Sequence, residues 1–82
     1  NGFAEEKMES LRSVGYTALT NGTTDFTSEL PSTLSPPRSG TYLVSTQSAN
    51  VKKIVLTLTY TVQGQLQTFN YTSYIGRTGI GQ

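Results

Sequence analysis

Five acidic side chains are the first groups in this chain that could do chemistry, and all of them lie within the first 29 residues. Glu5, Glu6 and Glu9 fall in one short segment with helical composition, which places them on a single solvated helix. Paired catalytic carboxylates instead face each other across a cleft. The chain has no histidine and no cysteine, so the commonest general base and the thiol nucleophile are both missing. We predict that the protein is not an enzyme.

Ligands for a metal ion or a cofactor are scarce in the sequence. The nitrogen and sulfur ligands that transition metals prefer are absent. Asp25 and Glu29 could contribute to a calcium loop, but the spaced oxygen ligands of such a loop are missing. Gly76, Gly79 and Gly81 are closely spaced, yet no helix follows them to hold a phosphate. We expect no metal and no cofactor.

Basic side chains are too few and too dispersed to predict a nucleic-acid-binding surface. Lys52 and Lys53 are adjacent, and Arg38 and Arg77 are the other bases in the second part of the chain. Dispersed bases of this kind are typical of charges that flank a strand, keep it soluble and protect its edge. Contact of Lys52 and Lys53 with DNA is kept as an alternative hypothesis.

The length of 82 residues predicts a single small domain covering residues 1–82. A chain of this size buries only about 60% of its unfolded surface. The net charge of +1 is unevenly distributed: two bases against five acids leave the first 29 residues at −3, and four bases leave the remainder at +4. This polarity suits head-to-tail association between copies as well as pairing within one chain.

Residues 1–14 are predicted to form the only helix. Apolar residues at i, i+4, i+7 and i+10 form a stripe along it, and Gly15 is expected to end it in the left-handed conformation. A helix of this length is marginal on its own in water, so it must dock on another element or continue a longer helix upstream. The stripe consists of Ala4, Met8, Leu11 and Val14.

Residues 15–40 are predicted to be an irregular connection between the helix and the sheet. Asn21-Gly22 is a turn signal, and Asp25-Phe26-Thr27 could form a short strand anchored by Phe26. Residues 30–40 contain three prolines, which remove backbone donors and fix φ, so we expect no regular structure there. A loop of this length is a candidate for variable surface contacts.

Residues 41–75 are predicted to form a three-stranded antiparallel meander, with the stretch near Phe26 as an alternative fourth strand. A two-residue loop at Gln63-Gly64 makes the numbers of paired residues sum to 127, so Leu58 faces Phe69. In the preceding hairpin we expect a three-residue loop, Ser48-Ala49-Asn50, with Asn50 in the left-handed conformation. In that hairpin the sequence numbers of two paired residues sum to 98, so Val44 faces Ile54. Residues 76–82 read as a loose tail.

These registers place the apolar residues of all three strands on one face. Met8 and Leu11 of the helix are expected to cover that face, while Leu43 and Val55 form a small patch on the opposite one. The predicted fold class is therefore α+β, an N-terminal helix packed on a three- to four-stranded antiparallel sheet. The predicted core face consists of Tyr42, Val44, Ile54, Leu56, Leu58, Phe69 and Tyr71.

The helix sequence resembles one family. Residues 2–12, Gly-Phe-Ala-Glu-Glu-Lys-Met-Glu-Ser-Leu-Arg, are similar to the stretch that follows the membrane-spanning part of bacterial type IV pilin-like proteins. Minor pilins and the small pseudopilins of type II secretion often have A-x-E-K-M-E-x-L-R there. Residues 52–60, a basic pair followed by a β-branched alternating strand, also resemble that group.

The resemblance implies a structural subunit whose leader is cleaved by a prepilin peptidase and whose upstream hydrophobic helix packs in the filament core. Such a subunit is anchored in the inner membrane before assembly and then stands at the cell surface or in the periplasm. No position here matches the leader site or the glutamate used in assembly. The lack of cysteine excludes the disulfide-bounded loop of many major pilins, which favours a minor pilin or pseudopilin.

Other pilin or pseudopilin subunits are the partners that the resemblance implies. We expect contacts with neighbouring subunits at Glu5, Glu6, Lys7 and Arg12, with residues 30–40 as a more variable contact surface.

Two other functions remain as alternatives. A surface adhesin or carbohydrate-binding β module would use Tyr60, Tyr71 and Tyr74 with nearby amides. A competence-type pilin that takes up DNA would use Lys52 and Lys53.

Overall fold

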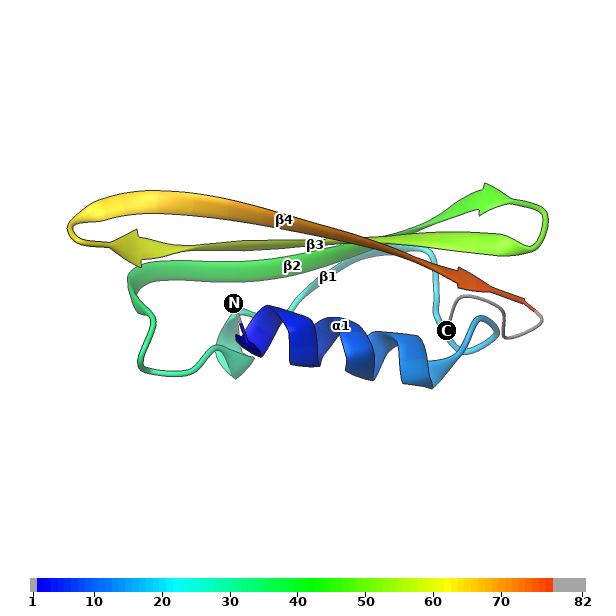
Figure 1. Cartoon of the computed structure of the whole chain (residues 1–82), viewed down its shortest axis with the longest axis horizontal. Helices are drawn as coiled ribbons and strands as arrows, with labels where there is room; N and C mark the ends of the chain where they lie inside the picture. The colour runs from blue at the N-terminus through cyan, green and yellow to red at the C-terminus, as the bar shows by residue number, and fades with distance from the viewer. Residues whose placement is uncertain (1, 78–82) are drawn as a thin grey trace.

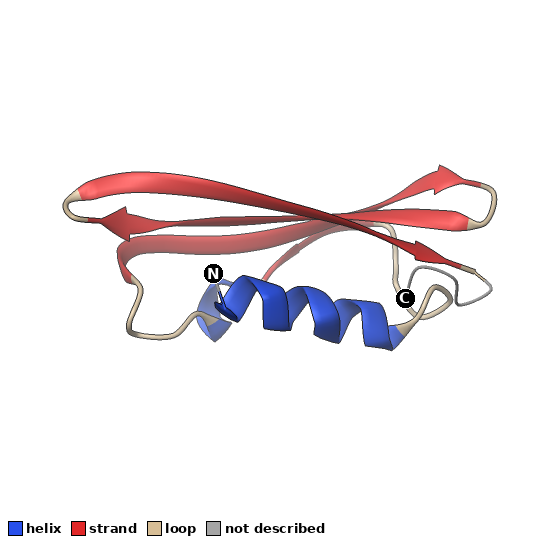
Figure 2. Cartoon of the chain, in the orientation of Figure 1, coloured by secondary structure: helices blue, strands red, loops and turns tan. Residues whose placement is uncertain are grey.

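A helix lying along one face of an antiparallel sheet is the main feature of the computed structural model, which describes residues 2–77 (Figures 1 and 2). The four strands follow one another in the order β1-β2-β3-β4, each antiparallel to its neighbour. The predicted α+β class is confirmed. The elements are α1 (Gly2–Val14), β1 (Gly22–Asp25), the 3-10 turn η1 (Thr27–Glu29), β2 (Ser35–Ser48), β3 (Val51–Val62) and β4 (Gln65–Gly76).

The β3–β4 hairpin has the register that the sequence predicted. Leu58 pairs with Phe69, and the sum of 127 holds from one end of the ladder to the other. Gln63 and Gly64 have φ values of 51° and 80°, which are the two left-handed positions of a type I′ turn. Because such a turn matches the twist of the strands, the two-residue loop fixes the pairing of the whole hairpin.

The β2–β3 hairpin has the predicted pairing but a different turn. Val44 pairs with Ile54, as expected, whereas Ser48 pairs with Val51 and leaves a two-residue connection. The register shifts by one residue between Thr46 and Ser48. The predicted three-residue loop was wrong, and so was a left-handed Asn50, because the bulge beside Ser48 accommodates the extra residue.

The prediction that residues 30–40 lack regular structure was wrong for their second half, because β2 already begins at Ser35. The ladder between β2 and β3 shifts register between Ser35 and Ser39. Pro36, Pro37 and Arg38 therefore lie at an irregularity of the strand. β1 pairs only with residues 41–44 of β2. The proline-containing part of β2 is therefore a sheet edge, where a missing backbone donor breaks no ladder bond.

The rest of the connection is also more regular than predicted. A fourth strand is present, but it is β1, which ends one residue before Phe26, and Thr27 begins η1. Gly15 ends α1 with φ of 95°, as expected. Gly76 closes β4 instead of starting a tail, and residues 78–82 of the predicted tail lie outside the described residues.

The core lies between α1 and the inner face of the sheet. Ala4 and Leu11 are buried, and Met8 packs beside them, but Val14 is 49% exposed. The prediction for Val14 was wrong because ten residues of helix turn it about 80° away from Ala4. Phe69 packs against Tyr60, with ring centroids 5.3 Å apart. The buried core residues are Ala4, Leu11, Leu19, Phe26, Leu30, Val44, Ile54, Leu56, Leu58 and Ile75.

Phe26 occupies a space that only glycine leaves open. Its ring lies 6.1 Å from the rings of both Phe3 and Tyr42, measured between centroids. A Cβ atom added at Gly40 would stand 2.7 Å from Phe26 Cε2, closer than real contacts allow. The Phe26 backbone N–H also donates to the Gly40 carbonyl over 2.9 Å. The close approach of β2 to Phe26 therefore depends on glycine at this position.

Gly40→Ala is expected to lower the free energy of unfolding by about 2 kcal/mol, because the packed Phe26 ring cannot move aside without strain. Urea denaturation followed by circular dichroism measures the change. Gly2→Ala is the matched control, since a Cβ there meets no atom within 4 Å. Equal stability of the two variants would contradict the close contact at Gly40.

Candidate functional site

The four charged residues of α1 predicted as subunit contacts do not share one surface. Glu5 and Glu6 are exposed, whereas Lys7 and Arg12 are half-buried. Successive helical residues point about 100° apart, so one run of charged residues is distributed around the helix. Only Glu5 and Glu6 among the four are fully available to a neighbouring molecule.

Lys7 contacts the rest of its own chain. Its Nζ lies 2.8 Å from Glu29 Oε1. The same ammonium stands 5.2 Å from the ring centroid of Phe26 and 5.8 Å from that of Tyr42. These distances are within the range of cation–π attraction. Lys7 therefore ties α1 to η1 and to the sheet.

The adjacent bases of β3 point to opposite faces of the sheet. Lys52 lies on the inner face, where its Nζ donates to the Tyr16 carbonyl over 2.8 Å and to the Leu19 carbonyl. The ammonium also stands 4.4 Å from the centroid of the Tyr16 ring. Lys53 pairs with Tyr74 on the outer face. The two lysines therefore share no surface that could contact one DNA molecule.

The three tyrosines of the adhesin alternative do not gather either. Tyr60 and Tyr71 lie on the inner face and pack against the core, whereas Tyr74 is 46% exposed on the outer face. A sugar-binding platform requires aromatic and amide groups that converge in one concave site. This geometry gives no such convergence for the three rings.

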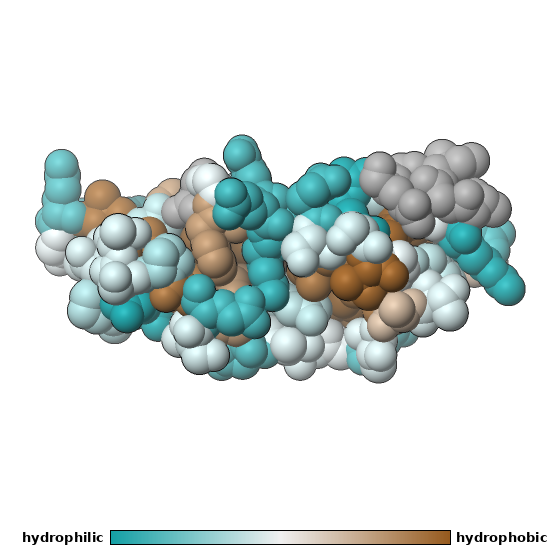
Figure 3. Space-filling view, turned by 90° about the horizontal axis from the view of Figure 1, so that it is seen from below, coloured by the Kyte–Doolittle hydropathy of each residue, from teal (hydrophilic) through white to brown (hydrophobic). Residues whose placement is uncertain are grey.

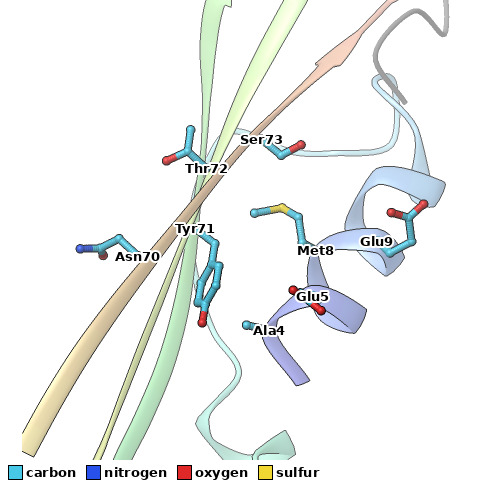
Figure 4. Close-up of a pocket in the computed structure, with 8 residues that line it drawn as sticks. All are labelled: Ala4, Glu5, Met8, Glu9, Asn70, Tyr71, Thr72 and Ser73. Atoms are coloured by element: carbon cyan, nitrogen blue, oxygen red, sulfur yellow. The ribbon is translucent and has the colours of Figure 1, made fainter. Parts of the chain in front are cut away.

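A cleft between α1 and β4 is a concave site formed by the described residues (Figure 4). Its volume is about 490 Å³. In Figure 4 the Tyr71 ring points from β4 towards the start of α1, and the Met8 side chain points from α1 towards the strand. One wall, on α1, is apolar and carries carboxylates, and the other consists of the β4 backbone with the side chains of Tyr71 and Ser73. The lining residues are Ala4, Glu5, Met8, Glu9, Asn70, Tyr71, Thr72 and Ser73.

The cleft is acidic. Two of its lining residues are glutamates, Glu5 and Glu9, and none is a base. Burial raises the pKa of Tyr71 above its usual range, and the charges of Tyr60 and Glu5 raise it further. The phenol therefore stays neutral at physiological pH. Glu5 and Glu9 make the site suited to a cationic ligand.

Within residues 2–77, no three His, Cys, Asp or Glu side chains gather closely enough to hold a metal ion. The same residues contain no helix with both the length and the apolar character needed to cross a bilayer. The chemistry that the cleft does support is non-covalent binding through carboxylates, hydroxyls and the strand backbone.

Sequence reasoning missed the β4 side of this cleft. Glu9 was assigned to a solvated helix face, and Ser73 received no functional role. A signal was nevertheless present, because residues 65–76 form the last strand of the meander and contain neither a charged residue nor a proline. The predicted order of the meander placed that strand at the edge of the sheet.

Comparison with known protein families, with curated proteins and with solved structures gives no match to this chain. The likeness to pilin-like proteins therefore rests on the residues of α1 and β3 quoted in the sequence analysis.

Lys52→Met is expected to lower the free energy of unfolding by about 1–2 kcal/mol, because two carbonyls after α1 lose a charged donor. Lys53→Met is the matched control, with an expected change within about 0.5 kcal/mol, since it replaces a neighbouring lysine on the outer face. Thermal unfolding followed by circular dichroism compares them. A larger loss for Lys53→Met would contradict the assigned role of Lys52.

Proposed function

We propose that this chain is part of a structural subunit of a bacterial filament, either a minor pilin of a type IV pilus or a pseudopilin of a type II secretion system. One observation carries the proposal. An amphipathic helix comes first in the chain and docks along one face of an antiparallel meander whose strands follow in chain order. The resemblance of residues 2–12 to pilin-like proteins implies this layout for the part outside the membrane.

The exposed side of α1 supports a role in contacts between subunits. The inner side of the helix is closed by Ala4 and Leu11, and the outer side presents Glu5, Glu6 and Glu9. Figure 3, seen from the helix side, shows apolar surface as separate patches among polar side chains. A surface of this kind stays soluble before assembly and still offers charges to a neighbouring subunit.

The two faces of the molecule differ in charge, which favours head-to-tail contacts. The α1 face carries the three glutamates, and the outer face of the sheet carries Lys53 beside Tyr74. Contacts between two different surfaces of identical or similar subunits can repeat without closing, and they then build filaments. The elongated shape, 43 × 17 × 17 Å, gives such a subunit two distinct long sides.

The function in this proposal is mechanical. An apolar helix continuous with α1 anchors the subunit in the inner membrane and later in the filament core, while the sheet stands outside that core. The turns at both ends of the β3 strand and residues 30–40 then face the surroundings of the filament.

The natural full-length protein carrying Glu6→Cys, labelled at that thiol with benzophenone maleimide, is expected to photo-cross-link to a neighbouring subunit in sheared filaments, because Glu6 is exposed on α1. The 82 residues contain no cysteine, so a single introduced thiol reports on one position of this domain. Mass spectrometry of the cross-linked band identifies the neighbour.

Gln47→Cys, an exposed position at the β2–β3 end of the sheet, is the control and is expected to give less cross-linking. Absence of the protein from the filament fraction would contradict the proposal. So would a gene that encodes no apolar segment of about 20 residues immediately before Asn1.

A further inference from the structure

The free edge of β4 is long and carries none of the usual protection against pairing. β4 is the last strand of the sheet, spans 12 residues and pairs with β3 without a register shift. Its sequence has no charged residue and no proline. Natural proteins generally block an exposed edge with charges, prolines, bulges or a short strand. Within residues 2–77 no segment pairs with the outer side of β4.

The opposite edge of the same sheet is protected in the ordinary way. β1 has only four residues and includes Asp25. Beyond β1 the edge is formed by the start of β2, which has two prolines, Arg38 and a register shift. Only one of the two edges has therefore kept an open row of backbone donors and acceptors.

The residues that present this open row can be identified from the ladder. The Arg77 N–H donates to the Asn50 carbonyl over 2.7 Å. The numbers of these two residues also sum to 127, so they continue the β3–β4 ladder as a hydrogen-bonded pair. In an antiparallel pair, alternate residues direct both backbone groups to the partner strand. Odd-numbered residues of β4 therefore bond to β3, and even-numbered residues direct their N–H and C=O outwards. The outward residues from one end of β4 to the other are Leu66, Thr68, Asn70, Thr72, Tyr74 and Gly76, and all of them except Gly76 are exposed.

The acidic cleft runs beside the middle of this edge. Glu5 and Glu9 are four helical residues apart, which corresponds to about 6 Å along α1. Alternate residues of an extended strand are about 6.7 Å apart. A strand added to β4 would turn every second side chain towards α1. Two basic side chains at alternate positions would then match the spacing of Glu5 and Glu9.

We propose that the edge of β4 binds an extended segment of another protein by strand addition, and that this segment carries lysine or arginine at alternate positions. Its backbone pairs with the outward groups of Asn70 and Thr72, and its basic side chains enter the cleft beside Glu5 and Glu9. Main-chain bonds of this kind supply affinity, and pockets for alternate side chains supply specificity. The proposal is independent of the filament function.

Charge argues against a second copy of this chain as the occupant. β4 contains no base, so pairing β4 of one copy with β4 of another would bring two acidic clefts together without a counter-charge. β1, at the other edge, is short and includes Asp25. A basic segment from a different protein is the partner that complements the cleft.

A fluorescein-labelled heptapeptide of alternating threonine and lysine is the probe, with binding measured by fluorescence anisotropy at low salt. We expect saturable binding to the wild-type chain, and about tenfold weaker binding to the double variant Glu5→Gln/Glu9→Gln. Glu6→Gln is the matched control, because Glu6 is exposed on the same helix but does not line the cleft. Its affinity is expected to stay within about twofold of wild type.

The backbone contact is tested in both molecules. Thr72→Pro removes an outward N–H and is expected to abolish binding, whereas Thr72→Val keeps the N–H and retains it. Two further peptides, N-methylated either on all lysines or on all threonines, test the contact without altering the protein. Because one edge of the added strand faces β4, one methylated peptide is expected to lose binding and the other to retain it.

Three results would overturn the proposal. The first is no binding at about 1 mM peptide. The second is equal binding by a peptide with glutamate in place of lysine, or by both methylated peptides. The third is a dimer of the free chain, seen by analytical ultracentrifugation, that the Thr72→Pro substitution abolishes. Such a dimer would show that a second copy of the chain binds the edge of β4.

Discussion

The register of the β3–β4 hairpin is the constraint on which the rest of the structure depends. Gln63 and Gly64 both take left-handed φ values, and this turn fixes every pair in the ladder. A slip of one residue would move the side chains of β4 to the other face of the sheet and take Tyr71 and Ile75 out of the core. The same register decides which backbone groups of β4 face outwards.

Much of the sheet was predictable from sequence because its signals are local. Alternating apolar residues define the inner face, and the Gln63-Gly64 turn sets the pairs. The errors arose where the outcome depends on a distant neighbour. The prolines before Ser39 are tolerated because β1 ends short of them, and Lys52 binds the carbonyls of Tyr16 and Leu19, far away in the sequence. Neither condition can be read from nearby residues.

The candidate site combines two features that are unremarkable when taken singly. Glu5 and Glu9 look like an ordinary solvated helix face, and the strand from Gln65 to Gly76 looks like an ordinary threonine-rich strand. Docking of α1 beside β4 turns them into an acidic cleft next to an open edge. The sequence indicated each half, and the packing of the helix on the sheet joins them. Glu5 and Glu9 belong to both proposals, because they lie on the charged side of α1 and also line the cleft beside β4.

Native-state amide hydrogen exchange in β4, measured by NMR on the free chain, tests the register and the open edge most directly. The N–H groups of Phe69, Tyr71 and Ser73 are expected to exchange at least about 100-fold more slowly than those of Asn70 and Thr72. The difference follows from the alternation of bonded and outward groups along the strand. Uniform protection of all five, or slower exchange at Asn70 and Thr72, would contradict both the register and the free edge.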